Sequence, residues 1–154
     1  MSLGGGGGGG GAMQQIQEQM QALEQEKEAI QNEIENVRTE QAEIDEAIEA
    51  IGTLDTGSTV QVPLGGDAYV RAEIQDIDEV IVTLGGGYAA ERDSEGAVDS
   101  LEHKKETLDD RIDDLESEIE AVEEETEQLE AKAQQAQQQQ MQQMQQQMQA
   151  QDDE

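Results

Sequence analysis

The sequence predicts an α+β protein in which two long helices pair as an antiparallel coiled coil and are joined by two β-hairpins. Two patterns and one kind of turn carry this prediction. Apolar residues recur about every 3.5 residues in both outer parts of the chain, which is the spacing of a coiled coil. In the middle part they alternate with period two, as in β-strands, and glycine-rich turns separate the apolar runs.

Residues 13–52 are expected to form the first helix. Their apolar positions alternate spacings of three and four residues, which indicates a left-handed coiled coil because a stripe of this period stays against a partner helix. Lys27 and Gln41 occupy two positions of the stripe, and Gly52 is expected to end the helix in the left-handed conformation. The apolar members of this first stripe are Met13, Ile16, Met20, Leu23, Ile30, Ile34, Val37, Ile44, Ile48 and Ile51.

Residues 97–133 repeat the pattern and are expected to form the second helix. Both helices lead away from the middle part, so the simplest pairing is an antiparallel hairpin that brings Ile51 near Val98 and Ile44 near Lys105. Polar residues within such a stripe usually fix the register of the pairing at some cost in stability. The second stripe contains Val98, Leu101, Leu108, Ile112, Leu115, Ile119, Val122 and Leu129, with Lys105 and Thr126 as its polar members.

Residues 53–96 contain four runs that read as strands, Thr59–Pro63, Ala68–Ile74, Val80–Leu84 and Tyr88–Arg92, and they form two hairpins. An isolated hairpin is at best marginally stable in water, and this segment lacks Phe and Trp to enlarge a core. We therefore expect the strands to need a partner. The apolar residues expected to lie in the resulting association surface are Val60, Val62, Val70, Ile74, Val80, Val82 and Leu84.

The two ends of the chain differ from the coiled-coil pattern. Residues 1–12 include eight consecutive glycines and are expected to be a disordered head, since neither a strand nor the lysine of a phosphate loop accompanies them. Residues 134–154 are rich in glutamine and methionine and are expected to be a flexible or frayed helical tail. Met141, Met144 and Met148 keep a helical spacing there, displaced by one position from the earlier stripe.

Composition excludes several classes of protein. A formal net charge of -30 would repel nucleic acid and anionic membranes, and an aromatic content of 1% does not suit a thick globular core. The acidic surplus has two interpretations, disorder or adaptation to high salt, and the regular stripes favour the second. The absence of cysteine rules out disulfides, and no secretion signal or membrane span is recognisable, so we expect a cytoplasmic protein.

The sequence predicts no catalytic, cofactor or metal site, and we do not expect an enzyme. His103 is off the stripe of the second helix, and the acidic runs of that helix are expected to be a solvated face. The turns at 64–67 and 84–88 resemble phosphate-binding loops only superficially, because each connects two strands and opens no helix.

Two hairpin sequences carry a resemblance to a known family. Residues 62–70 read VPLGGDAYV in the first hairpin, and residues 84–91 read LGGGYAAE in the second. Together with matched heptads on both sides, these segments resemble the archaeal prefoldin α subunit over residues 13–133. In that family, two hairpins rather than one distinguish the α type from the β type. The polyglycine head and the Gln/Met-rich tail depart from the family pattern.

The resemblance implies a hexamer of two α-type and four β-type prefoldin subunits, whose hairpins form a double β-barrel platform for oligomerisation. It also implies an ATP-independent chaperone that holds unfolded proteins at the ends of its coiled coils and passes them to a group II chaperonin. A structural coiled-coil scaffold or spacer without client binding is the alternative, although it leaves the hairpins unexplained. The candidates for client binding are Met13, Ile16, Met20, Met141, Met144 and Met148.

Overall fold

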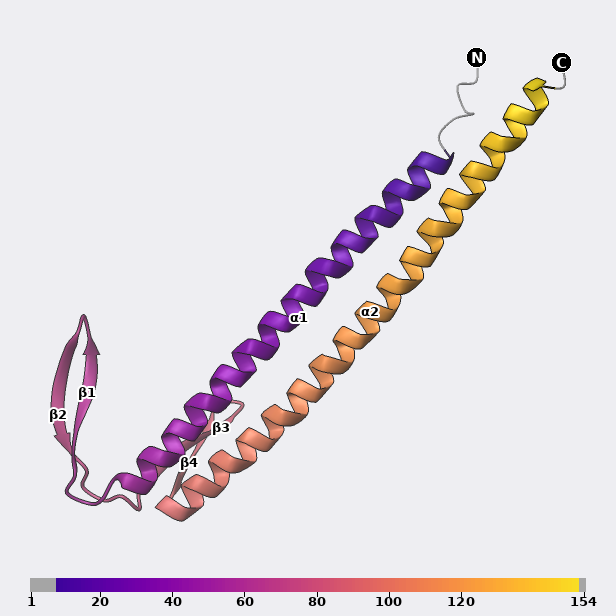
Figure 1. Ribbon diagram of the computed structural model, residues 1–154. Helices are drawn as coiled ribbons and strands as arrows, with labels where there is room; N and C mark the ends of the chain where they lie inside the picture. Colours follow the sequence, from indigo (N-terminus) through magenta and orange to yellow (C-terminus); the bar gives the residue numbers. More distant parts are fainter. Residues whose placement is uncertain (1–7, 153–154) are drawn as a thin grey trace. The chain divides into compact units, whose positions relative to one another are not determined.

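The computed structural model describes residues 8–152, which contain two helices and two pairs of antiparallel strands (Figure 1). The predicted fold class is therefore confirmed. The helices are α1, Gly8–Thr53, and α2, Ser94–Asp152. The strands are β1, Thr59–Gly65, β2, Ala68–Glu73, β3, Val80–Gly85, and β4, Tyr88–Arg92.

The chain divides into two compact units, and both helices pass through both of them. The first unit combines Met1–Ile34 with Asp114–Glu154, and the second is Glu35–Asp113. The first unit is thus a pair of helical segments alone, whereas the second adds both hairpins to a helical pair.

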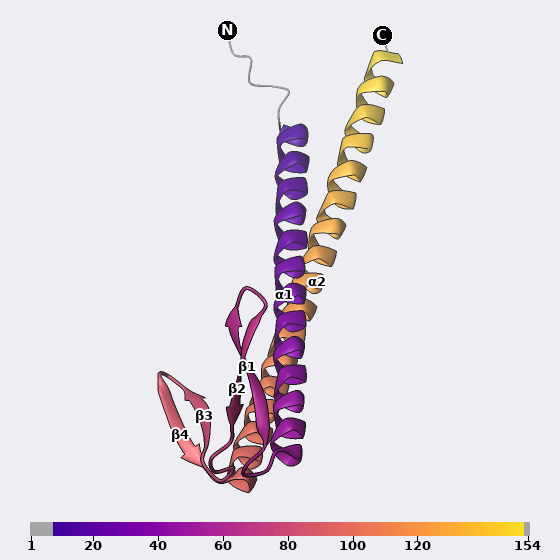
Figure 2. The same cartoon turned by 90° about the vertical axis from the view of Figure 1, so that its left-hand side faces the viewer.

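In the first unit, one row of side chains from each helix forms the core. Leu115 is fully buried, and the other buried apolar residues of this unit are Leu23, Ile30, Ile34, Val122 and Leu129. Lys27 Nζ of α1 lies 3.1 Å from Glu123 Oε1 of α2. This ion pair joins the two segments, which run alongside each other in opposite directions in both views (Figures 1 and 2).

The second unit repeats this arrangement with its own helical segments. Its buried residues include Val37 and Ile44 of the α1 stripe and Ile112 of the α2 stripe. Ala97, which precedes the stripe residue Val98 in α2, is also buried. Every residue predicted on the two stripes, including the four polar ones, is buried or half-buried. The heptad interpretation is therefore confirmed. Ile51 and Val98, which were predicted to lie near each other, both line one hollow of this unit.

The helix ends next to the hairpins differ in how they are capped. The side chain of Asp93 accepts a hydrogen bond from the backbone N–H of Gly96 at 2.7 Å, which is the usual way to satisfy a helix N-terminus. The prediction that Gly52 caps α1 is wrong, because Gly52 lies within the helix and is not among the described residues with positive φ. Instead, the backbone N–H of Leu54 and the hydroxyl of Thr53 both donate to the carbonyl of Ala50.

The outer ends of the helices extend beyond the predicted boundaries. Of the head expected to be disordered, residues 1–7 lie outside the described residues, but Gly8–Ala12 form the first turns of α1. Each glycine costs about 1 kcal/mol relative to alanine, yet extending an existing helix avoids the larger cost of nucleation. The Gln/Met-rich segment is also helical, because α2 continues to Asp152.

Each hairpin is a separate two-stranded sheet. In the first, Val62 faces Val70, and the turn residues Gly66 and Asp67 both have positive φ, 59° and 62°, as a type I′ turn requires. The register shifts between Pro63 and Gly65, so Leu64 is the extra residue of a β-bulge. The second hairpin repeats this design with its shift between Thr83 and Gly85.

Candidate interaction surfaces

The first hairpin presents an open apolar face. Val62 and Val70 are directly opposed across the two strands, and 41% and 45% of their surfaces are exposed. Val60 and Ile74 are half-buried, and in the sequence they lie further from the hairpin turn than Val62 and Val70 do. The sequence analysis thus placed these residues on one face, and the structure leaves that face accessible.

The second hairpin is used differently, because its corresponding face packs within its own unit. Val82 is only 4% exposed and Val80 is half-buried, so Val82 belongs to the core of this unit rather than to a free surface. Leu84 is partly exposed and lines a hollow of about 380 Å³ with α2 residues such as Lys104 and Leu108. The period-two pattern placed Val82 with the other six candidates because it does not reveal what covers a strand.

Sequence reasoning missed four other exposed apolar side chains of the hairpins. Each of them lies in a turn, at a bulge or on the face of a strand opposite to the predicted apolar face. The alternating pattern predicts polar residues at such positions. Their β-branched, branched aliphatic or aromatic side chains are the signal that could have identified them. They are Leu64, Tyr69, Ile81 and Tyr88.

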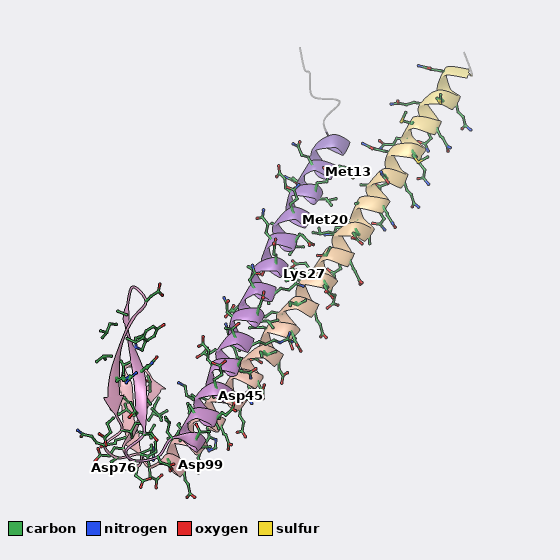
Figure 3. The ribbon with its side chains drawn as sticks, turned by 60° about the vertical axis from the view of Figure 1, so that its left-hand side comes forward. Met13, Met20, Lys27, Asp45, Asp76 and Asp99 are labelled. Atoms are coloured by element: carbon green, nitrogen blue, oxygen red, sulfur yellow. The ribbon has the colours of Figure 1, made fainter. Side chains whose placement is uncertain are left out.

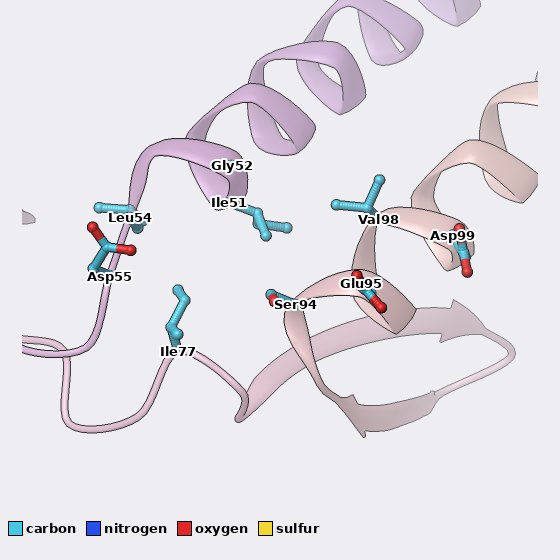
Figure 4. Close-up of a pocket in the computed structure, with 9 residues that line it drawn as sticks. All are labelled: Ile51, Gly52, Leu54, Asp55, Ile77, Ser94, Glu95, Val98 and Asp99. Atoms are coloured by element: carbon cyan, nitrogen blue, oxygen red, sulfur yellow. The ribbon is translucent and has the colours of Figure 1, made fainter.

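The hairpins connect to the helices around a second hollow of about 550 Å³ (Figure 4). Its apolar lining comes from the end of α1, the loop between β2 and β3, and the start of α2, with Ile51, Ile77 and Val98 as representatives. Asp55, Glu95 and Asp99 add acidic groups to the same lining, beside the remaining residues Gly52, Leu54 and Ser94.

The described residues contain no group of three or more His, Asp or Glu side chains placed to hold a metal ion. His103 is largely exposed, and its Nδ1 lies 3.7 Å from Glu106 Oε2 one turn further along α2. Over the same range, no helix is both long enough and apolar enough to cross a membrane.

Three polar members of the stripes find partners across the helix pair. Beside the Lys27–Glu123 pair of the first unit, the Gln41 amide of the second unit donates to the Lys105 carbonyl at 3.2 Å and to Asp109 Oδ1 at 2.6 Å. Lys105 Nζ lies 2.7 Å from Asp45 Oδ1. Each of these contacts joins α1 to α2, so they select the observed register over a shifted one.

The contact between Lys105 and Asp45 should affect the titration of Lys105. Its pKa is raised above the ordinary 10.5, chiefly by the hydrogen bond with Asp45, while desolvation acts in the opposite direction. A raised folded-state pKa means that the contribution to stability is complete below the unfolded pKa and is lost as pH rises through the folded value. We expect Asp45→Asn to lower the pKa of Lys105 in an NMR titration of its ε-carbon, with Glu46→Gln as control. Identical titration curves for the parent and Asp45→Asn would contradict this.

The six candidates for client binding lie in the first unit and fall into two groups, and Figure 3 labels Met13 and Met20 of the first group. Met13, Ile16 and Met20 of α1 are half-buried on the coiled-coil stripe. The methionine stripe of α2, namely Met141, Met144 and Met148, is exposed at 65%, 65% and 69%. Only the second group is therefore accessible without a change in helix pairing.

Comparison with known proteins places this architecture in a family. The model of the family described as "Prefoldin subunit" matches residues 23–152. Prefoldin subunit alpha of Haloarcula marismortui is 75% identical over 73 residues, which are 47% of this chain and 47% of that protein. Prefoldin subunit alpha of Methanobrevibacter smithii is 32% identical over 98 residues, 62% of this chain and 67% of that protein. The match spans about half the length of the first of these relatives and of other haloarchaeal alpha subunits.

A solved structure agrees with the sequence comparison. Filamentous PFD from Methanocaldococcus jannaschii superposes with a TM-score of 0.65 at 27% identity, covering 75% of this chain and 98% of that one. The family match covers most of the sequence, identities of 75% and 67% are to haloarchaeal alpha subunits, and the fold has the two hairpins expected of the α type. The chain therefore belongs to the prefoldin family and is of its archaeal alpha-subunit type.

Proposed function

We propose that this chain is the α-type subunit of an ATP-independent chaperone that holds unfolded proteins and transfers them to a group II chaperonin. The assembly is a hexamer of two α-type and four β-type subunits, in keeping with the family to which the chain belongs. The observation that carries the proposal is the exposed methionine stripe of α2 on a helix whose Val, Leu and Ile side chains are all buried or half-buried.

The methionine stripe suits a client of no fixed sequence. Methionine is unbranched and polarizable, so a row of three can repack against different apolar segments, whereas a rigid pocket would select one shape. Each contact is weak. Several subunits gripping one client would give an avidity greater than that of any single contact.

The first hairpin supports the proposed assembly. Each described sheet has only two strands, so every strand has one edge without a backbone partner. Such sheets are marginal alone, and free edges favour pairing with strands of another chain. The exposed Val62 and Val70 supply an apolar face beside these edges, which β-type subunits would cover.

A structural scaffold remains the second candidate function. The observation in its favour is that the Methanocaldococcus jannaschii relative is described as filamentous, which is a property of that protein. A scaffold that forms filaments, unlike a simple spacer, would use the hairpins for assembly, but it would have no use for the methionine stripe. Removing the stripe therefore separates the two functions.

The test compares heteromers carrying Met141→Gln, Met144→Gln and Met148→Gln with the parent, in high salt and with a chemically denatured client. We expect the triple variant to lose most of its suppression of aggregation, measured by light scattering, because an apolar surface has been replaced by amides. Gln139→Ala, Gln142→Ala and Gln146→Ala change the far side of the same helix and should leave suppression intact.

The variant with Met13, Ile16 and Met20 changed to Gln completes the comparison. These residues are half-buried in the stripe, so their loss should also loosen the helix pair, which circular dichroism will detect. Equal suppression by the parent and by both variants, with assembly intact, would move client binding off this subunit and favour the scaffold.

A further inference from the structure

The residues around the methionine stripe are uncharged, in contrast to the rest of the chain. No ionisable side chain occurs from Ala133 to Gln151, although the sequence carries 38 acidic residues and 8 basic ones. On α1, Glu18 is the first ionisable side chain of the sequence. The uncharged segment of α2, defined here as residues 133–151, therefore begins directly after Lys132 and ends directly before Asp152.

Two features keep the methionine stripe uncovered. The coiled-coil stripe continues through the half-buried Ala133 and Ala136, and all described side chains from Gln137 onward are exposed. The methionines are one position out of phase with that stripe, which rotates them by about 100° around the helix axis.

The facing part of α1 also lacks side chains. Extending the register of the Lys27–Glu123 pair within the first unit brings Gly9 opposite Met141. A Cβ atom added at Gly11 would meet no atom within 4 Å. The glycine-rich start of α1 thus cannot cover the uncharged segment of α2.

We propose that the uncharged segment accommodates acidic flanks, so that it binds apolar stretches of acidic non-native chains as well as those of neutral ones. This inference rests on the proposed function and adds the charge class of the client. A basic client would bind more tightly if carboxylates surrounded the contact. Residues 133–151 contain no carboxylate, so they offer no such attraction to a basic client. For an acidic client, any carboxylate of this subunit at the contact would weaken binding, because it would have to lose its water next to carboxylates of the client.

Glutamine fits this role because its amide is neutral and both donates and accepts hydrogen bonds. It can therefore satisfy backbone groups and carboxylates of a client at the border of the apolar contact. Desolvation, unlike long-range repulsion, is not removed by salt, so a neutral contact remains useful where screening is already strong.

The probes are three unfolded peptides with one shared apolar core and flanks of Asp, Ser or Lys. Their affinity for the assembled heteromer is measured in high salt by fluorescence anisotropy. We expect the parent to bind the Asp-flanked and Ser-flanked peptides within about threefold of each other, because the contact carries no charge of its own. Preference of the parent for the Lys-flanked peptide by more than about tenfold would overturn the inference.

Gln140→Glu and Gln145→Glu place charges on the two borders of the methionine stripe. We expect this double variant to bind the Asp-flanked peptide about tenfold more weakly and the Ser-flanked peptide within about threefold of the parent, owing to carboxylates brought together in the contact. Gln139→Glu and Gln146→Glu add the same charge on the far side of the helix and should change neither affinity by more than about twofold.

The triple methionine variant separates failure of this inference from failure of the proposed function. If it binds the Ser-flanked peptide as the parent does, the proposed function fails. If it loses that binding while Gln140→Glu and Gln145→Glu leave the Asp-flanked affinity unchanged, client binding stands and the inferred advantage of an uncharged contact for acidic clients is wrong.

Discussion

A chain carrying Val62→Asp and Val70→Asp is expected to stay out of the heteromer while keeping its two helices. In the single chain these residues are about half exposed and face each other across the first hairpin, so added carboxylates remain solvated. In the assembly they would be buried in an apolar surface, where each unpaired charge costs a few kcal/mol, roughly 2 or more. A cost of this size for two residues would abolish stable association.

The measurement is the mass of the complex formed with a β-type subunit in high salt, by native mass spectrometry. Thr59→Asp and Gln61→Asp are the matched control, because they add the same two charges to the other face of β1. Val82→Asp is unsuitable, since Val82 is buried in its own unit and its replacement would disrupt the chain itself. A normal hexamer from the Val62 and Val70 variant would refute the assembly surface.

Withdrawal of salt is expected to unfold the helix pair and to dissociate the heteromer. The net charge of -30 creates repulsion whose range is about 30 Å at 0.01 M ionic strength and about 3 Å at 1 M. Helical circular dichroism at 222 nm and heteromer mass should therefore both fall together in dilute buffer. Retention of full helicity and assembly in dilute buffer would exclude the adaptation to high salt.

A charge-reduced variant separates repulsion from the general strengthening of apolar burial by salt. Glu118→Gln, Glu120→Gln and Glu124→Gln remove three carboxylates from exposed positions of α2. We expect the midpoint of the salt transition to shift to lower concentration, because less repulsion has to be screened. An unchanged midpoint would assign the salt requirement to apolar burial instead.

Where the candidate site lies could be predicted only in part. The spacing of Met141, Met144 and Met148 identified a stripe, but its exposure depends on where the cover from α1 ends. That end is set by the glycine-rich start of α1, which the sequence analysis expected to be disordered and which is helical from Gly8.

The sequence alone determined the elements and their pairing. Both stripes, the four strands and the two hairpin turns follow from local periodicity and from the special conformations of glycine, which act within a few residues. The antiparallel pairing follows from these elements because both helices lead away from the hairpins. Such signals need no knowledge of distant neighbours. The family could be identified from the same residues, but its extent could not: the family match covers residues 23–152, which include the Gln/Met-rich tail, instead of the predicted 13–133.

The tertiary structure decided which predicted faces are open and which polar residues are paired. Val62, Val70 and Val82 have equivalent places in the alternating pattern, yet only Val82 is buried in its own unit. Alternation determines which side chains share a face of a strand, and packing against another element determines whether that face is covered. Likewise, Lys105 pairs with Asp45 because the paired helices bring these two side chains, which are far apart in the sequence, within reach of each other. Heptad spacing alone specifies no such contact.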